Sequence, residues 1–423
     1  MIERRKMFKK KLTPFLCLML CFAVCVVTFV ATFSISNLKH KNDTRDLREK
    51  LAEAEKSKSA SLKETFGDDA DKYLKLLDVI GYIDDNYIRD YDKSAAWANV
   101  YKAYAYAIGD NYSDYFTSDE YAAMTDESDG DFVGIGVHAV FDPDTEGIYI
   151  FGVMPSSPAE SAGIQNGDII VEAMGVKATA ENYYDMLDLI RGEAGTEVEL
   201  TVLRGGENKS FKITRRAVPS QNVLYENLGD GVGYITILTF SDSTLASQFV
   251  AIMEKAKADG CDKFIFDVRN NSGGYLTEII KVLDYLLPEG VLINIVDADG
   301  NQRVQESDKN FLDAKMVVLC NKNTASAAEL FTAALRDFKV STTVGVTTFG
   351  KGTMQTTHVF EDGSAVKTST AYYNPPCNVS YDAIGISPDV EVKLDEKWED
   401  KFYQMPREED TQLAKAIEII KAD

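Results

Sequence analysis

Short apolar runs alternate with amphipathic stretches across residues 218–394, and this pattern constrains the fold more than any other feature of the chain. The runs Lys263–Val268 and Lys315–Cys320 have the length and the β-branched or aromatic content of buried strands. Helical periodicity appears between such runs, over Thr244–Ala258 and Leu276–Leu287. Because strands that alternate with helices usually pair in parallel, we expect an α/β core with a largely parallel sheet. Side chains that carry chemistry are then expected where the strands end.

Ser326 and Lys351 each follow an apolar run of this core and lie in a polar turn. The turn that contains Ser326 (NTASAAELF) reopens as a helix, where free backbone N–H groups and the helix dipole favour an oxyanion. Lys351 stands between two glycines (FGKGT), and a lysine in a water-poor cleft can lose its charge and act as a base. Alone, the serine would be a helix cap and the lysine a turn residue. Together they predict a Ser-Lys hydrolase.

Histidine and metal chemistry are poorly supported. The chain has three histidines, of which His40 adjoins a long uncharged segment and His138 lies in a separate module. His358 is near Lys351 in sequence, but it belongs to an alternating stretch (TMQTTHVF) and is expected on one face of a strand. The sequence contains neither HExxH nor CxxC spacing, so we expect no metal and no cofactor.

A second piece of the expected site is a glycine turn (VRNNSGGYL) that follows the strand over residues 264–268. Gly273 and Gly274 let backbone N–H groups face a substrate without a Cβ in the way. Asp267 and Arg269 stand at the strand end, where we interpret them as residues that satisfy neighbouring backbone groups.

These motifs resemble those of the C-terminal processing peptidases, the tail-specific serine proteases of peptidase family S41. The family pattern is S-A-S-A-S-E, then a helix-end aspartate, then F-G-K-G-x-x-Q after a strand. The resemblance implies a nucleophile, a general base, a glutamine that orients the base and a supporting aspartate, which are Ser326, Lys351, Gln355 and Asp337 in that order. The glycine turn is similar to the family's L-D-L-R-x-N-x-G-G element.

The same resemblance implies an oxyanion hole made of the Ala327 N–H and the N–H of Gly273 or Gly274, and the choice between the two glycines stays open. Two residues depart from the family pattern, because Thr324 and Ala328 stand where serines are common. Neither departure removes a catalytic group. They leave open the side-chain hydrogen bonding around the nucleophile turn.

Residues 131–217 are predicted to form a separate module. Apolar strands (GIYIFGV, TEVELTVL), a GIQNGD turn and a helix over Tyr183–Ile190 resemble a PDZ domain. A glycine-containing loop that leads into an exposed strand can hold a peptide carboxylate on backbone N–H groups while the peptide adds to the sheet. The peptide-binding residues implied by the resemblance are Gly134, Ile135, Gly136 and Val137.

Arg191 follows the predicted PDZ helix, in LIRGEAGT. It resembles an arginine that relays ligand binding from the PDZ domain to the protease domain in this family. The alternative is a solvated residue at a helix end. The sequence supports both interpretations.

Leu12–Ile35 is uncharged over 24 residues and follows a basic N-terminal stretch. A helix of that length is roughly 36 Å long, which is enough to cross a bilayer. The basic flank predicts a cytoplasmic N-terminus and an extracytoplasmic catalytic domain in a bacterial cell membrane. A cleaved signal peptide is the alternative, although no clear cleavage site follows.

The net charge limits the partners. The chain carries −22 and residues 1–40 contribute +6, so residues 41–423 carry −28, which would repel nucleic acid. Outside the uncharged segment the cysteines are few and widely spaced, and they predict no disulfide framework: Cys261, Cys320 and Cys377.

We therefore predict an α/β protein with a protease core, which the resemblance implies to be a crotonase-like ββα core, together with an inserted PDZ domain, an N-terminal helical segment and one transmembrane helix. The predicted parts are an anchor (1–38), a stalk (39–65), a helical segment (66–130), the PDZ domain (131–217), the core (218–394) and a C-terminal tail (395–423). The resemblance implies a serine endopeptidase that binds exposed protein C-termini, and a homodimer; the sequence leaves open whether an adaptor takes part. The alternative is a PDZ-gated or non-catalytic scaffold that binds C-terminal tails.

Overall fold

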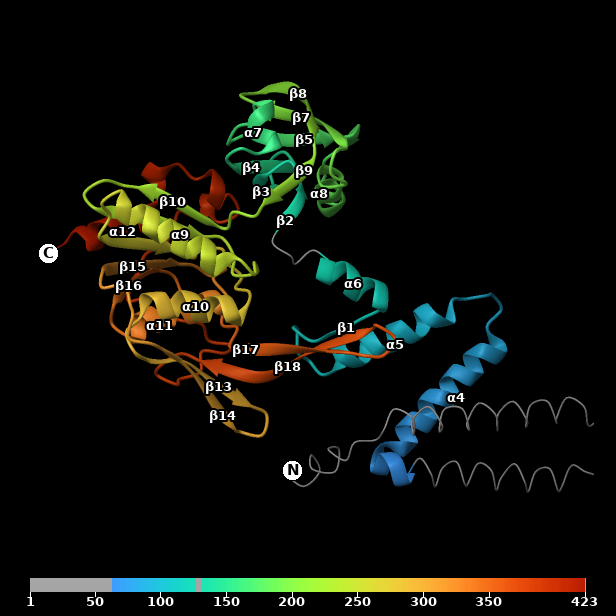
Figure 1. The fold of residues 1–423 in the computed structure, drawn as a ribbon. Coiled ribbons are helices and arrows are strands. Elements are labelled where there is room, and N and C mark those ends of the chain that lie inside the picture. The colour runs from blue at the N-terminus through green and yellow to red at the C-terminus, as the bar shows by residue number, and fades with distance from the viewer. Residues whose placement is uncertain (1–62, 127–130, 423) are drawn as a thin grey trace, which may run out of the picture. The chain divides into compact units, whose positions relative to one another are not determined.

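The structure is a computed structural model that describes residues 63–126 and 131–422. The predicted anchor and most of the predicted stalk lie outside these ranges. Within them, no helix has both the length and the apolar character that crossing a membrane requires. The chain divides into two compact units, residues 1–93 and residues 94–423 (Figure 1).

The described part of the first unit is helical. A short 3₁₀ turn, η1 (Gly67–Asp69), leads into α4 (Ala70–Asn86), and α5 (Lys93–Ala107) begins at the end of this unit. The helix α4 buries only Ala70, and Tyr82 is 71% exposed. Residues 63–93 therefore bury little apolar surface.

The second unit is built on a six-stranded sheet. Its strand order is β10-β11-β12-β15-β16-β19, in which only the β10–β11 pair is antiparallel. The bounds are β10 (Val223–Asn227), β11 (Val232–Ile237), β12 (Lys263–Asp267), β15 (Lys315–Cys320), β16 (Ser341–Gly345) and β19 (Val390–Glu391). The predicted largely parallel sheet is confirmed.

Helices cover both faces of this sheet. On one face lie α9 (Leu245–Ala258), α10 (Leu276–Leu286) and α11 (Ala327–Asp337), and on the other lies α12 (Thr411–Lys421). Successive side chains of a strand point to opposite faces, so Phe264 and Phe266 pack under the first group while Ile265 packs under α12. The predicted C-terminal tail is thus a structural part of the core.

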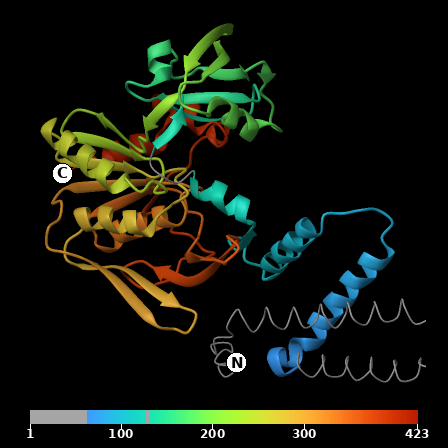
Figure 2. The same cartoon turned by 45° about the vertical axis from the view of Figure 1, so that its right-hand side comes forward.

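A second, antiparallel sheet was not predicted. It consists of β1 (Asp114–Phe116), β13 (Gly290–Asp297), β14 (Gln302–Ser307), β17 (Thr353–Val359) and β18 (Ala365–Asn374). The paired strands β17 and β18 extend from the core, and β1 pairs with β18 (Figures 1 and 2). The predicted helical segment over 66–130 also contains the strand β1, which local periodicity could not reveal because its partner strand lies about 250 positions further along the chain.

The PDZ module has its own core and sheet. Its strands are β3 (Val137–Asp142), β4 (Gly147–Val153), β5 (Ile169–Ala173), β6 (Val176–Lys177), β7 (Glu197–Arg204) and β8 (Glu207–Thr214), and a separate pair joins β2 (Asp131–Gly134) to β9 (Arg216–Pro219). Two helices, α7 (Pro158–Ala162) and α8 (Tyr183–Ile190), complete it, and between β1 and β2 lies α6 (Ser118–Asp126). The module contacts the C-terminal segment, where Phe151 stacks on Tyr403 with ring centroids 4.0 Å apart.

Candidate active site

Ser326 is the N-cap residue of α11, as the strand-turn-helix pattern predicts. Its backbone has φ 57° and ψ −122°, a conformation that L-residues rarely adopt. Its N–H donates to a carboxylate oxygen of Glu329, three residues later, at 2.9 Å. This is the reach-back contact that an S-x-x-E sequence makes at a helix start, and it fixes the turn that presents the serine.

Glu329 joins the two turns of the site. Its carboxylate is fully buried, and each oxygen accepts two hydrogen bonds. One oxygen accepts from the Thr348 hydroxyl at 2.5 Å and the Gly350 N–H at 2.7 Å, and the other accepts from the N–H groups of Ser326 at 2.9 Å and Lys351 at 2.8 Å. Burial raises the pKa of Glu329, and these donors oppose that shift. One side chain therefore sets the distance between the serine turn and the lysine turn.

Lys351 lies in a half-buried turn with its ammonium group over an aromatic ring. Its Nζ is 4.3 Å from the centroid of the Tyr112 ring. The pKa of Lys351 is lowered, first because burial disfavours the charged form and then because Lys367 repels it, while Asp110 and Glu329 act in the opposite direction. A lowered pKa makes the uncharged amine accessible at a lower pH than for a solvated lysine.

In the described structure, Ser326 Oγ and Lys351 Nζ are not hydrogen-bonded to each other. The Tyr373 hydroxyl instead lies 2.7 Å from Ser326 Oγ and 2.8 Å from the Lys351 carbonyl oxygen. A hydroxyl has one proton and a carbonyl oxygen only accepts, so with Tyr373 donating to the carbonyl, the serine hydroxyl can donate to Tyr373. The two turns are adjacent, but their reactive groups each have another partner.

The glycine turn packs directly against the nucleophile turn. A Cβ added at Gly273 would lie 2.6 Å from Ser326 Cβ and 2.9 Å from the Ala327 nitrogen. The Gly273 N–H already donates to the Asn271 side chain at 2.8 Å. Among the backbone hydrogen bonds of residues 131–422, none has the Gly274 or Ala327 N–H as donor. Both N–H groups are therefore without an acceptor in the described structure.

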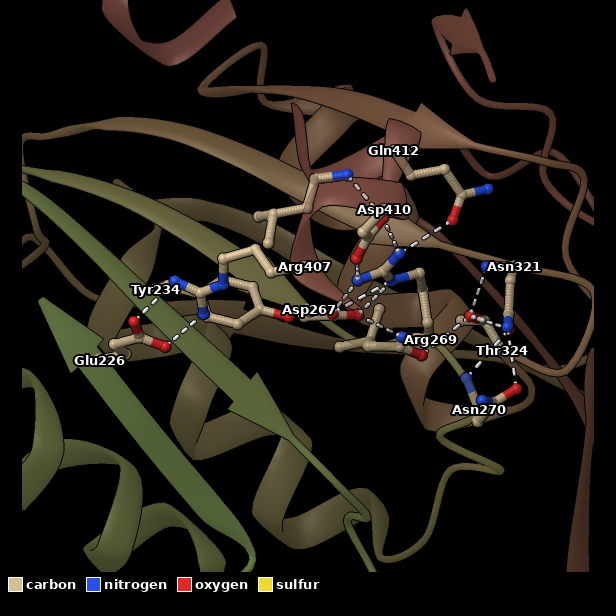
Figure 3. A network of polar contacts seen from close by, with 12 residues as sticks. Glu226, Tyr234, Asp267, Arg269, Asn270, Asn321, Thr324, Arg407, Asp410 and Gln412 are labelled. Carbon is tan, nitrogen blue, oxygen red and sulfur yellow. Dashed lines mark hydrogen bonds and ion pairs between the residues drawn. The ribbon is translucent and has the colours of Figure 1, made fainter. Parts of the chain in front are cut away.

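A buried ion network anchors the strand that leads into the glycine turn (Figure 3). Arg269 is 3% exposed and lies between the carboxylates of Asp267 at 2.7 Å and Asp410 at 2.8 Å, and it also donates to Gln412 at 3.1 Å. The Arg269 N–H donates to Asp267 Oδ1 at 2.9 Å, so Asp267 satisfies a neighbouring backbone group as the sequence predicts. The interpretation is wrong for Arg269, because its guanidinium donates to the side chains of Asp267, Asp410 and Gln412 and, within the described structure, to no backbone group. The network also ties β12 to α12.

The departures from the family pattern are accommodated locally. Thr324 donates from its hydroxyl to the Val268 carbonyl at 2.8 Å and accepts from the Asn321 N–H at 2.9 Å, so it links the nucleophile turn to β12. Ala328 is fully buried in the core on α11. The side-chain hydrogen bonding that the sequence left open is supplied by Thr324.

Three predicted or considered residues lie away from the reacting groups. The Gln355 amide donates to Thr353 and, at 2.9 Å, to Ser369, and in the described structure it makes no hydrogen bond with Lys351. Asp337 is the last residue of α11, at the opposite end of the helix from Ser326. The Asp337 carboxylate accepts from the Cys377 N–H at 3.1 Å. His358 is exposed on β17 beside Phe360.

The predicted peptide-binding residues line a groove of about 270 Å³ in the PDZ module. All four residues from Gly134 to Val137 contribute, together with Leu187, Ile190 and Arg191 from the helix α8 and its end. His138 also lines it, and burial lowers the pKa of this imidazole to about 4. The strand β3 and the helix α8 therefore form the two walls, and Arg191 lies at the end of one of them.

The comparisons with known proteins agree with this architecture. Residues 231–392 match peptidase family S41, and residues 149–204 match a PDZ domain. The first match includes both turns of the site and the glycine turn. The chain belongs to peptidase family S41.

Two relatives of this S41 chain are CtpA-like serine proteases. That of Staphylococcus haemolyticus is 35% identical over 289 residues, which are 67% of this chain and 58% of the relative. That of Staphylococcus saprophyticus is 33% identical over 330 residues, which are 77% and 66% of the two chains. This chain thus spans less than two thirds of the length of these relatives.

A solved structure shares the fold of this S41 chain. The S41 protease from Bacteroides fragilis has a TM-score of 0.55 and 18% identity over 76% of this chain and 90% of that one. At this identity the likeness concerns the fold alone.

Three residues of the S41 site were not found by sequence reasoning. Glu329 had a local signal, because it stands at the third helical position of an S-x-x-E capping box. Tyr373 and Tyr112 had none. The Tyr112 ring lies against Lys351, which is far from it in sequence.

Proposed function

We propose that this protein is a membrane-anchored, extracytoplasmic serine endopeptidase that recognises protein C-termini through its PDZ domain and cleaves by a Ser-Lys mechanism. The observation that carries the proposal is the arrangement around Glu329, which holds the Ser326 turn and the Lys351 turn on one carboxylate. Beside Ser326, the Gly274 and Ala327 N–H groups make no hydrogen bond within the described structure. A nucleophile, a base with a lowered pKa and two oxyanion donors are the parts that acyl transfer needs.

In the proposed reaction Ser326 Oγ attacks the scissile carbonyl while uncharged Lys351 takes the serine proton. The Ala327 and Gly274 N–H groups stabilise the oxyanion of the tetrahedral intermediate. Lys351 then gives the proton to the leaving amine, and water hydrolyses the acyl-enzyme by the same route. In this scheme Gln355 orients Lys351, as the family resemblance implies, through β17, which begins two residues after the lysine. Asp337 supports α11, the helix that Ser326 caps.

The anchor, the extracytoplasmic location and the crotonase-like description of the core stay predictions. The uncharged stretch Leu12–Ile35 and its basic flank support the first two. Polypeptides with exposed C-termini are the proposed substrates, because a groove walled by a strand and a helix suits an added peptide strand. A homodimer rests on the family resemblance, and the participation of an adaptor stays open.

The proposal is tested by cleavage of an unfolded reporter that ends in a free apolar C-terminus, with the full-length chain in lipid nanodiscs. We expect cleavage of this reporter and a lower rate on the same reporter with an amidated C-terminus, because amidation removes the carboxylate that the PDZ loop would bind. Equal rates on both reporters would contradict C-terminal recognition, and binding without cleavage would favour the scaffold.

A PDZ-gated enzyme is the second candidate. A Ser-Lys dyad requires contact between the serine hydroxyl and the lysine amine, but Ser326 Oγ contacts Tyr373 and Lys351 Nζ contacts the Tyr112 ring. We expect a peptide with a free C-terminus, added in trans, to increase cleavage of the amidated reporter. In Arg191→Ala the peptide-induced increase in cleavage rate should be smaller by a factor of about five or more, which is the low end of typical allosteric coupling. The reason is that Arg191 lies at the end of one wall of the groove. Arg303→Ala, on exposed β14, is the matched control. An unchanged response in Arg191→Ala would exclude the relay.

The pH dependence of kcat/KM should report Lys351. Activity needs the uncharged amine, so it should rise with pH through the Lys351 pKa, and this limb should lie below the pKa of a solvated lysine. Lys367→Met removes a repelling charge, which raises the Lys351 pKa and moves the limb to higher pH. Lys309→Met, at an exposed position, should leave the limb in place. A limb that does not move in Lys367→Met would argue against Lys351 as the base.

A further inference from the structure

Lys351 Nζ has one close partner in the described structure, and that partner is an aromatic ring. No carboxylate of residues 63–126 or 131–422 lies within ion-pair distance of it, whereas the Tyr112 ring centroid is 4.3 Å away. An ammonium group at this distance from a tyrosine face is attracted by the ring quadrupole, and an uncharged amine is not. The contact therefore favours the protonated lysine, which is the form that cannot accept the serine proton.

The ring is held in place by the antiparallel sheet. Tyr112 lies in the loop between α5 and β1, and its N–H donates to Asp110 at 3.1 Å. The Ser113 hydroxyl donates to the same carboxylate at 2.5 Å, and the Thr368 hydroxyl of β18, 3.0 Å away, can donate to Ser113 Oγ. The strand β18 also carries Tyr373, the hydrogen-bond partner of Ser326. One strand therefore positions Tyr373 and also the loop that holds Tyr112, the partner of Lys351.

We propose that Tyr112 is a positioning residue that holds Lys351 as an ammonium group in a resting site, so that the base must leave the ring before it can serve Ser326. This inference rests on the proposed Ser-Lys mechanism. The serine is matched in the same resting state, because its Oγ is hydrogen-bonded to Tyr373 rather than to the lysine. Activation would then be a movement of the Lys351 side chain from the Tyr112 ring to Ser326 Oγ.

Other groups around Lys351 also affect its charge and have to be kept constant in a test. Lys367 on β18 disfavours the ammonium, and Asp110 and Glu329 favour it. Next to Lys351 in the chain, the Gly352 N–H donates to the Asp382 carboxylate at 2.8 Å. A substitution at Tyr112 that preserves shape changes none of these groups, so it isolates the contribution of the ring.

The test measures the rate at which an alkyl fluorophosphonate labels Ser326 in the full-length chain, as a function of pH. In this reaction the serine oxygen bonds to phosphorus, fluoride leaves, and the base takes the serine proton. Tyr112→Leu removes the ring, so on the acid limb, where the rate follows the uncharged fraction of Lys351, we expect labelling to be roughly two- to fivefold faster than in the wild type. The limb should move to lower pH.

Two kinds of variant control this experiment. Tyr112→Phe keeps the ring face and should keep the wild-type limb. Fluorinated phenylalanines at position 112 keep the shape of the ring but weaken its quadrupole, so the labelling rate should rise with each added fluorine. This series tests the ring even if Tyr112→Leu folds poorly. Tyr106→Leu, which changes an 82% exposed tyrosine of α5, should match the wild type.

The outcomes separate the two proposals. Labelling that needs Lys351 but does not respond to ring chemistry at position 112 would overturn the resting site alone. Labelling that is absent, or that is unchanged in Lys351→Met, would overturn the Ser-Lys mechanism and the resting site with it.

Discussion

Ser326→Ala is expected to lower the cleavage rate by about 10⁵-fold or more, because the enzyme then has no nucleophile and the other parts of the site cannot replace it. The fold should be retained. Alanine keeps the Cβ, so the φ 57° backbone is no more strained than before, and the Ser326 N–H can still donate to Glu329. The measurement is reporter cleavage together with the thermal unfolding midpoint.

The matched control for this variant is Ser210→Ala, which changes an exposed serine on β8 of the PDZ module. It should cleave the reporter at the wild-type rate. Full activity in Ser326→Ala would exclude the serine as the nucleophile. Loss of activity with a large fall in the unfolding midpoint would show that the serine hydroxyl acts in folding rather than in catalysis.

Asp410→Ala is expected to lower the free energy of unfolding by about 3–5 kcal/mol, the usual cost of removing one partner of a buried ion pair. Arg269 would lose a carboxylate 2.8 Å away while staying buried (Figure 3). The substitution also removes an N-cap, because the Asp410 side chain accepts from the Leu413 N–H at 2.9 Å at the start of α12. Urea unfolding of the wild type and the variant measures the change.

Asp410→Asn separates the two contributions. Asparagine can still cap α12, but it has no charge to offer Arg269, so its stability should lie between that of the wild type and that of Asp410→Ala. The comparison with an exposed ion pair is Glu418→Ala, which removes a partner of Lys415 and should change the stability little. A wild-type midpoint for Asp410→Ala would show that water reaches Arg269 and replaces the carboxylate.

Asp410→Ala should also reduce cleavage in the folded fraction. Arg269 is four residues before Gly273, and the segment between the end of β12 at Asp267 and the glycine turn is held through this arginine. If the arginine changes position, the glycine turn loses its support beside Ser326. Activity at a temperature below the unfolding transition distinguishes this effect from global unfolding.

Several elements of the fold could be predicted from local patterns. The helix over Tyr183–Ile190 and the strand Lys315–Cys320 have the predicted bounds, because periodicity and residue type are properties of consecutive residues. The helix start at Ser326 was predictable for the same reason. The strand β1 was not, since three residues form a strand only when a partner such as β18 supplies its hydrogen bonds.

By itself, the sequence determined the elements of the core, the helix start that presents Ser326, and the placement of Lys351 between glycines. The tertiary structure alone decided which distant groups meet there. It brought Glu329 to the lysine turn, Tyr373 to the serine, and Tyr112 to the lysine amine. The physical reason is that helix caps and strand periodicity arise from neighbours along the chain, whereas a cation over a ring or a shared carboxylate depends on how separate elements pack.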